Sequence, residues 1–204
     1  MALYALGDLH LSFQVNKPMD AFGRVWKRHE RKIEKYVNQI VESGDTLVLT
    51  GDHSWGRKLP ECREDLAFIE RLPGRKILLR GNHDMFWDAK KTARLNEEYA
   101  GRLFFLQNNF AAYKDYALVG TKGFTFEGPF YLNRRGEIIG WDEEKEVQAK
   151  KLVDRETARL RESFRQAEQA GYRKFIMFLH NPPTNILEIE SPFSKIAEEY
   201  RAAA

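Results

Sequence analysis

The chain has 204 residues, of which 43% are apolar and 31% are charged, and its net charge is +3. These proportions predict a globular protein that buries a core, and they exclude fibrous and disordered chains. No apolar run approaches the roughly 18 residues of a membrane span. The N-terminus lacks the basic start of a signal peptide, and the single cysteine, Cys62, excludes an internal disulfide. We therefore expect a soluble cytoplasmic protein with no membrane partner.

Short aliphatic runs that end at glycine or a polar residue predict buried strands. In chain order they cover residues 3–6, 46–50, 76–79 and 175–179, with 117–120 as a fifth and 103–106 as a weaker candidate. Apolar residues at helical spacing predict a helix from Pro18 to Ser43. A second helix is predicted from the N-cap Asp142 to Ala170. Strands alternating with helices indicate an α/β fold, and the absence of repeats or linkers predicts one domain over residues 1–204.

The stretch between residues 121 and 141 has a different composition. It carries five aromatic residues among five glycines and prolines, and the aromatics are Phe124, Phe126, Phe130, Tyr131 and Trp141. Such a segment could border a substrate site. It could equally be an irregular loop held to the body of the protein by its aromatic side chains.

Residues of the types that bind metals follow four of the predicted strands. They are Asp8-Leu9-His10, Gly51-Asp52-His53, Gly81-Asn82-His83-Asp84 and His180-Asn181. Ligands of α/β sheets bind at the carboxyl ends of the strands, so we expect these segments to meet. In an extended Asp-x-His, both side chains point to the same side. Asp, Asn and His suit divalent manganese, iron or zinc.

These motifs, in this order, resemble those of the calcineurin-like metallophosphoesterases between residues 7 and 181. The resemblance implies a four-layer α/β/β/α sandwich, of which the C-terminal part is missing here, and a centre of two divalent metal ions. It implies that Asp8 and His10 bind the first ion, that Asp52 bridges both ions, and that Asn82 and His180 bind the second.

The resemblance also implies the reaction. A hydroxide that bridges the two metals would attack the phosphorus of a small phosphorylated substrate, either a phosphomonoester or a phosphodiester. His83 would lie near the substrate without binding a metal, and would protonate or hydrogen-bond the leaving oxygen. Asp84 is the second catalytic candidate, as the acidic neighbour of His83, although neighbours in a chain often point apart.

Two departures from the family pattern matter. Protein phosphatases of the superfamily extend the second motif to Gly-Asp-x-x-Asp-Arg-Gly, whereas Trp55 and Gly56 occupy those Asp and Arg positions here. A Ser/Thr protein phosphatase is therefore not expected. The closing Gly-His-x-His motif is missing, since no histidine follows His180. We expect the natural protein to continue beyond residue 204, and a chain ending there to bind metal weakly.

Several alternatives stay open at this point. One is a catalytically impaired, metal-binding regulatory protein. Another is a nuclease, suggested by the mild basicity but ranked lowest, because no platform of regularly spaced aromatic and basic residues is visible. Arg57 and Lys58 could hold a substrate phosphate, although a solvated surface is the simpler interpretation. His29 and His53 are interpreted as structural residues, and the oligomeric state is left open.

Overall fold

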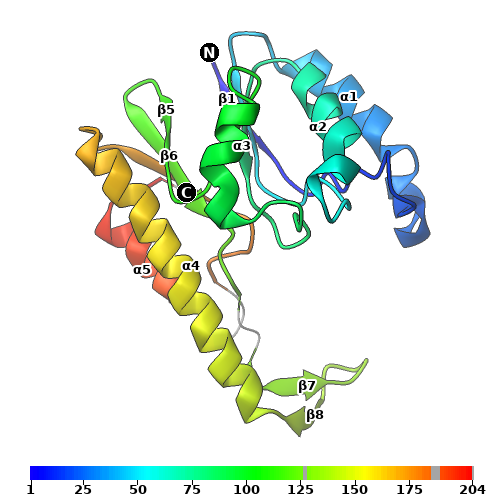
Figure 1. Cartoon of the computed structure of the whole chain (residues 1–204). Coiled ribbons are helices and arrows are strands. Elements are labelled where there is room, and N and C mark those ends of the chain that lie inside the picture. Colours follow the sequence, from blue (N-terminus) through cyan, green and yellow to red (C-terminus); the bar gives the residue numbers. More distant parts are fainter. Residues whose placement is uncertain (126–127, 185–188, 204) are drawn as a thin grey trace. The chain divides into compact units, whose positions relative to one another are not determined.

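A computed structural model of the chain describes residues 1–125, 128–184 and 189–203. The aromatic residue Phe126 and the terminal Ala204 lie outside the described residues. The chain divides into two compact units, Met1–Gln107 and Asn108–Ala204, whose elements are labelled in Figure 1. The single domain over residues 1–204 stays a prediction.

The first unit is built on a parallel sheet of four strands. Their order is β1 (Leu3–Leu6), β2 (Thr46–Leu49), β3 (Arg75–Leu79) and β4 (Leu103–Leu106). Leu6 pairs with Leu49, and Leu49 pairs with Leu78. Because all neighbours run parallel, their carboxyl ends lie at one edge of the sheet. The loops that follow β1, β2 and β3 therefore start side by side, as the sequence predicts.

Three helices complete this unit, namely α1 (His29–Ile40), α2 (Arg63–Arg71) and α3 (Thr92–Glu98). Short 3₁₀ segments precede them at η1 (Met19–Phe22), η2 (Arg24–Trp26), η3 (Leu59–Cys62) and η4 (Ala89–Lys91). One core joins helices and sheet through Val37, Leu66, Leu95 and the strand residues Leu47 and Leu78. Burial raises the pKa of the Cys62 thiol to about 12, which makes it an unreactive core residue.

The helix predicted from Pro18 is wrong in its first half. Gly23 has a φ of 124° and Arg28 a φ of 52°, and neither value fits an α-helix. The regular helix therefore begins only at His29. Phe22, one of the apolar residues at helical spacing in this segment, is 65% exposed.

The second unit contains a three-stranded sheet in the order β5 (Ala111–Tyr113), β6 (Tyr116–Thr121) and β9 (Phe175–Leu179). β6 and β9 run parallel. The long helix α4 (Glu143–Gln169) packs against β6, and α5 (Pro192–Glu199) packs against α4. The predicted N-cap is confirmed, because the Asp142 side chain accepts a hydrogen bond from the Lys145 amide.

Residues 130–141 form a hairpin rather than an irregular loop. It consists of β7 (Phe130–Leu132) and β8 (Ile138–Trp141). The hairpin is joined to the start of α4, because the Tyr131 hydroxyl donates to Asp142 at 2.6 Å. Trp141 is 63% exposed, so the aromatic residues do not all hold this segment to the protein.

The α/β class predicted from the sequence is confirmed by the parallel sheet and its helices. The four-layer arrangement stays a prediction. Among the described residues, no helix has the length and apolar character that crossing a membrane requires.

Candidate metal centre

The loops after β1 and β2 are fastened to each other through their backbones. The Asp8 amide donates to the Gly51 carbonyl at 3.0 Å, and the His10 amide donates to the Asp52 carbonyl at 2.8 Å. Asp8, His10 and Asp52 all have positive φ, at 56°, 45° and 56°. Such left-handed conformations cost of order 1–3 kcal/mol in a residue other than glycine, and they cluster at functional sites.

This backbone arrangement gathers three ligand-type side chains. His10 Nε2 lies 3.6 Å from Asp8 Oδ1 and 3.7 Å from Asp52 Oδ2. One donor atom from each of the three residues lies within 4.8 Å of the others. Atoms that each bind one ion at about 2.0–2.2 Å lie roughly 3–4 Å apart. The three side chains therefore fit a divalent cation placed between them.

The protonation of His10 favours metal binding. Burial lowers the pKa of His10, although the charges of Asp52 and Asp8 act to raise it. The imidazole is therefore mostly neutral at pH 7, which is the form that binds metals. Asp52 is almost fully buried, whereas the Asp8 side chain is 60% exposed.

The third loop closes against Asp52. The His83 amide donates to Asp52 Oδ1 at 2.8 Å. A side chain at Gly81 would collide with the Asp52 carboxylate, so this position requires glycine. Asn82, the exposed residue between Gly81 and His83, belongs to the same loop. Its role as a ligand stays a prediction.

His180 directly follows β9 and belongs to the second unit. The next residue is fixed locally, since the Asn181 amide donates to the Lys122 carbonyl at 2.8 Å. The role of His180 as a ligand of the second ion also stays a prediction.

His83 lies beside the three clustered donors. Its Nε2 is 4.0 Å from Asp52 Oδ2, and its ring centroid is 5.5 Å from that of His10. The side chain is 36% exposed, so a substrate can reach it. The Trp55 ring packs against both imidazoles, at 4.3 Å from His83 and 5.0 Å from His10.

Asp84 is buried and connects the loops that follow β2 and β3. Its fully buried carboxylate accepts hydrogen bonds from the amides of Gly81 (2.7 Å), Asp52 (2.9 Å) and His53 (2.8 Å). The His53 ring is bonded to the same carboxylate at 3.0 Å. The second catalytic candidate is thus bonded to His53. Because its side chain is fully buried, we propose a positioning role for Asp84, and its catalytic role stays a prediction.

The ionisation of Asp84 fits that role. Burial acts to raise its pKa, but the charge and hydrogen bond of His53, together with the backbone amides, hold the pKa at about 2. Asp84 is therefore a carboxylate at neutral pH and can accept all of these hydrogen bonds.

His29 also has a structural place. Its Nε2 lies 2.9 Å from the Leu9 carbonyl, and its Nδ1 lies 3.2 Å from the Trp26 carbonyl. His29 therefore supports the loop that carries Asp8 and His10 rather than belonging to the donor cluster.

Comparisons with known proteins show the family of this chain. A sequence model of the calcineurin-like phosphoesterase family matches residues 1–202. The chain belongs to the calcineurin-like phosphoesterase family. One similar solved structure is a protein of unknown function from Aquifex aeolicus, at 18% identity and a TM-score of 0.42. The similarity covers 100% of this chain and 88% of that one. A comparison with curated proteins finds no match.

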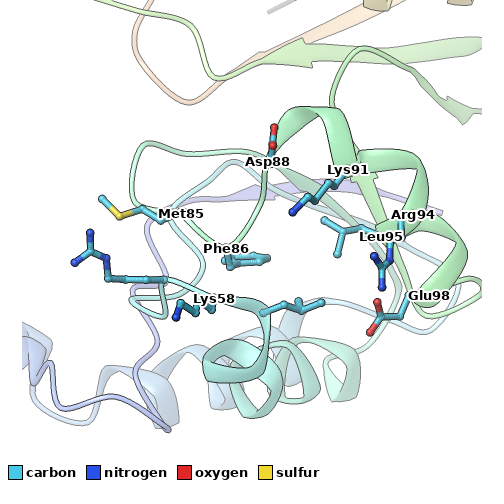
Figure 2. A pocket seen from close by; sticks show the side chains of 10 residues that line it. Lys58, Met85, Phe86, Asp88, Lys91, Arg94, Leu95 and Glu98 are labelled. Carbon is cyan, nitrogen blue, oxygen red and sulfur yellow. The ribbon is translucent and has the colours of Figure 1, made fainter.

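The chain has a pocket of 340 Å³ built from the segments that follow its second and third loops (Figure 2). Phe86 lines it, and the charged residues around it are Arg57, Lys58, Asp88, Lys91, Arg94 and Glu98. Met85, also in the lining, is two residues from His83, so their Cα atoms lie within about 7 Å. The pocket thus begins close to the candidate metal centre.

Proposed function

We propose that the protein hydrolyses phosphomonoesters or phosphodiesters with the help of two divalent cations, manganese, iron or zinc, bound at this centre. The observation that carries the proposal is the placement of His10 Nε2 opposite the carboxylates of Asp8 and Asp52, at 3.6 and 3.7 Å. Family membership supports the same reaction class. In the proposal, Asn82 and His180 complete the second cation site.

Asp52 suits the bridging position for a geometric reason. Its Oδ2 faces His10, while its Oδ1 faces the third loop through the His83 amide. The carboxylate thus reaches toward both halves of the proposed centre. Divalent cations bound there would neutralise phosphate oxygens and lower the pKa of a water molecule.

His83 is proposed to hold a proton toward the leaving oxygen. It is close to the centre, accessible to solvent, and confined on one side by the Trp55 ring. A donor fixed in this way can act on a bound ester without being a ligand.

The test of this role is His83→Ala. We expect turnover of phenyl phosphate to fall by about 10²–10⁴-fold, with the bound metal unchanged. The loss should be much smaller for p-nitrophenyl phosphate, because its acidic leaving group departs without protonation. Kinetics on both esters and metal analysis of both proteins provide the comparison, and Lys90→Ala serves as an exposed control. Loss of metal in a folded His83→Ala protein, or equal losses on the two esters, would show that His83 has another role.

A further inference from the structure

The positive charge of the chain is concentrated in one segment. Residues 24–35 carry six cations, namely Arg24, Lys27, Arg28, Arg31, Lys32 and Lys35, and two acids. The rest of the chain then holds 27 cations and 28 acids, out of totals of 33 and 30. The overall excess of positive charge therefore comes from these 12 residues, which include η2 and the first turns of α1.

These six cations surround one groove of 590 Å³, and no acidic residue lines it. All six side chains belong to exposed residues. Among the described parts of the chain, the six form a single ion pair, that of Arg31 with Glu30 at 3.9 Å. A groove lined by one sign of charge raises the local concentration of its counter-ions. It is therefore suited to an anionic ligand.

The segment that carries the groove also contacts the loop of the candidate metal centre. Trp26, which lies between Arg24 and Lys27 in the sequence, has its ring 5.9 Å from the ring of His10. His29, in the same segment, is bonded to the Leu9 carbonyl between the two ligand-type residues Asp8 and His10. The residues of the groove are therefore sequence neighbours of Trp26 and His29, which contact the loop of Asp8 and His10.

We propose that this groove binds the phosphate backbone of a single-stranded nucleic acid, whose phosphodiesters are the substrate of the centre. Six cations spread over 12 residues exceed what a single phosphate can contact, whereas a chain of phosphates can use them all. The lining includes the ring of Tyr36, which is 54% exposed. The Lys35 ammonium lies 5.4 Å from the centroid of this ring, and a base can stack there once the ammonium moves to a phosphate. That the centre hydrolyses the nucleic acid rests on the proposed function, whereas binding of the nucleic acid in the groove does not.

Binding is tested without metal. A labelled single-stranded oligonucleotide is titrated in EDTA with the protein, with a triple variant, Lys27→Ala, Arg31→Ala and Lys35→Ala, and with a control, Arg63→Ala, Arg71→Ala and Lys90→Ala. Both variants remove three exposed cations from the first unit, and thermal melting checks that both fold. The slope of log K against log salt should be smaller in magnitude by about 2 for the groove variant. Each of its three lost phosphate contacts contributes about 0.7 to that slope.

We expect the groove variant to bind at least about tenfold more weakly at low salt, and the control to bind like the unmodified protein. Absence of oligonucleotide binding, or equal weakening in the control, would overturn the proposal. Tighter binding of inorganic polyphosphate than of the oligonucleotide, at the same charge, would also overturn it, because the Tyr36 ring would then play no part.

A hydrolysis assay separates this inference from the proposed function. With manganese added, the groove variant should keep its rate on bis(p-nitrophenyl) phosphate while losing about tenfold in kcat/KM on the oligonucleotide. If the protein binds the oligonucleotide but hydrolyses neither substrate, the proposed function fails and the binding groove stands. If the groove variant and the unmodified protein cleave the oligonucleotide equally well, the groove proposal fails and the proposed function stands.

Discussion

Replacing Asp84 by Ala is expected to lower the free energy of unfolding of the first unit by about 3–5 kcal/mol. The substitution removes a carboxylate that accepts hydrogen bonds from three backbone amides and from the His53 ring. His53 is fully buried, so its ring would be left without this partner and without access to water. Urea denaturation followed by tryptophan fluorescence measures the change, and Asp20→Ala, an exposed acid, is the control.

The same variant should be less sensitive to acid. The pKa of Asp84 is held at about 2, below its ordinary value of 3.8, so its contribution to stability is complete above pH 4. That contribution is lost as the pH falls through about 2. Asp84→Ala should therefore lose less stability than the unmodified protein between these pH values. Equal losses, or a destabilisation no larger than that of Asp20→Ala, would contradict the positioning role.

Asp52→Asn should weaken metal binding by more than about 100-fold while the fold is kept. The amide has the same size as the carboxylate, and its oxygen can still accept the hydrogen bond from the His83 amide. It lacks the negative charge that faces His10 Nε2 and a cation between them. Since losses around a metal ligand already cost about 10–100-fold in affinity or activity, we expect a loss above about 100-fold for the ligand itself.

Calorimetric titration with manganese and the rate on p-nitrophenyl phosphate measure this effect. Asp20→Asn, which removes one exposed charge, should leave both quantities unchanged. A folded Asp52→Asn protein that binds manganese as tightly as the unmodified protein would remove Asp52 from the centre.

The strands and the ligand-bearing loops could be predicted from the sequence for a physical reason. Buried parallel strands are short aliphatic runs, and a parallel sheet places the residues that follow them at one edge. Asp8, His10 and Asp52 are found together for that reason. The glycine at position 81 is explained by the same packing, because the Asp52 carboxylate occupies the space of its missing side chain.

The side-chain contacts that hold the ligand-bearing loops in place could not be predicted from the pattern of strands. Asp84 and His53 are 31 residues apart, and no local pattern marks such a pair. The packing of Trp55 on His10 and His83 likewise joins three separate loops. These contacts depend on side-chain directions at loop residues, which sequence periodicity does not describe.

The first helix begins at His29 rather than at Pro18 for a local reason. The apolar spacing continues through Phe22 and Trp26, but Gly23 and Arg28 adopt positive φ and divide the segment into short turns. In this divided segment the Trp26 ring lies 5.9 Å from the His10 ring, and Arg24 and Lys27 line the groove.

The most direct test of a metal-dependent phosphoesterase is to remove all metal with a chelator and then titrate manganese back into the protein. Bound metal and the rate of p-nitrophenyl phosphate hydrolysis are measured on the same samples. We expect no hydrolysis without metal, a rate that rises in step with bound manganese, and neither metal nor activity in Asp52→Asn. A chelated protein that hydrolyses the ester at its full rate, or an Asp52→Asn protein that does so, would contradict the assignment of this centre.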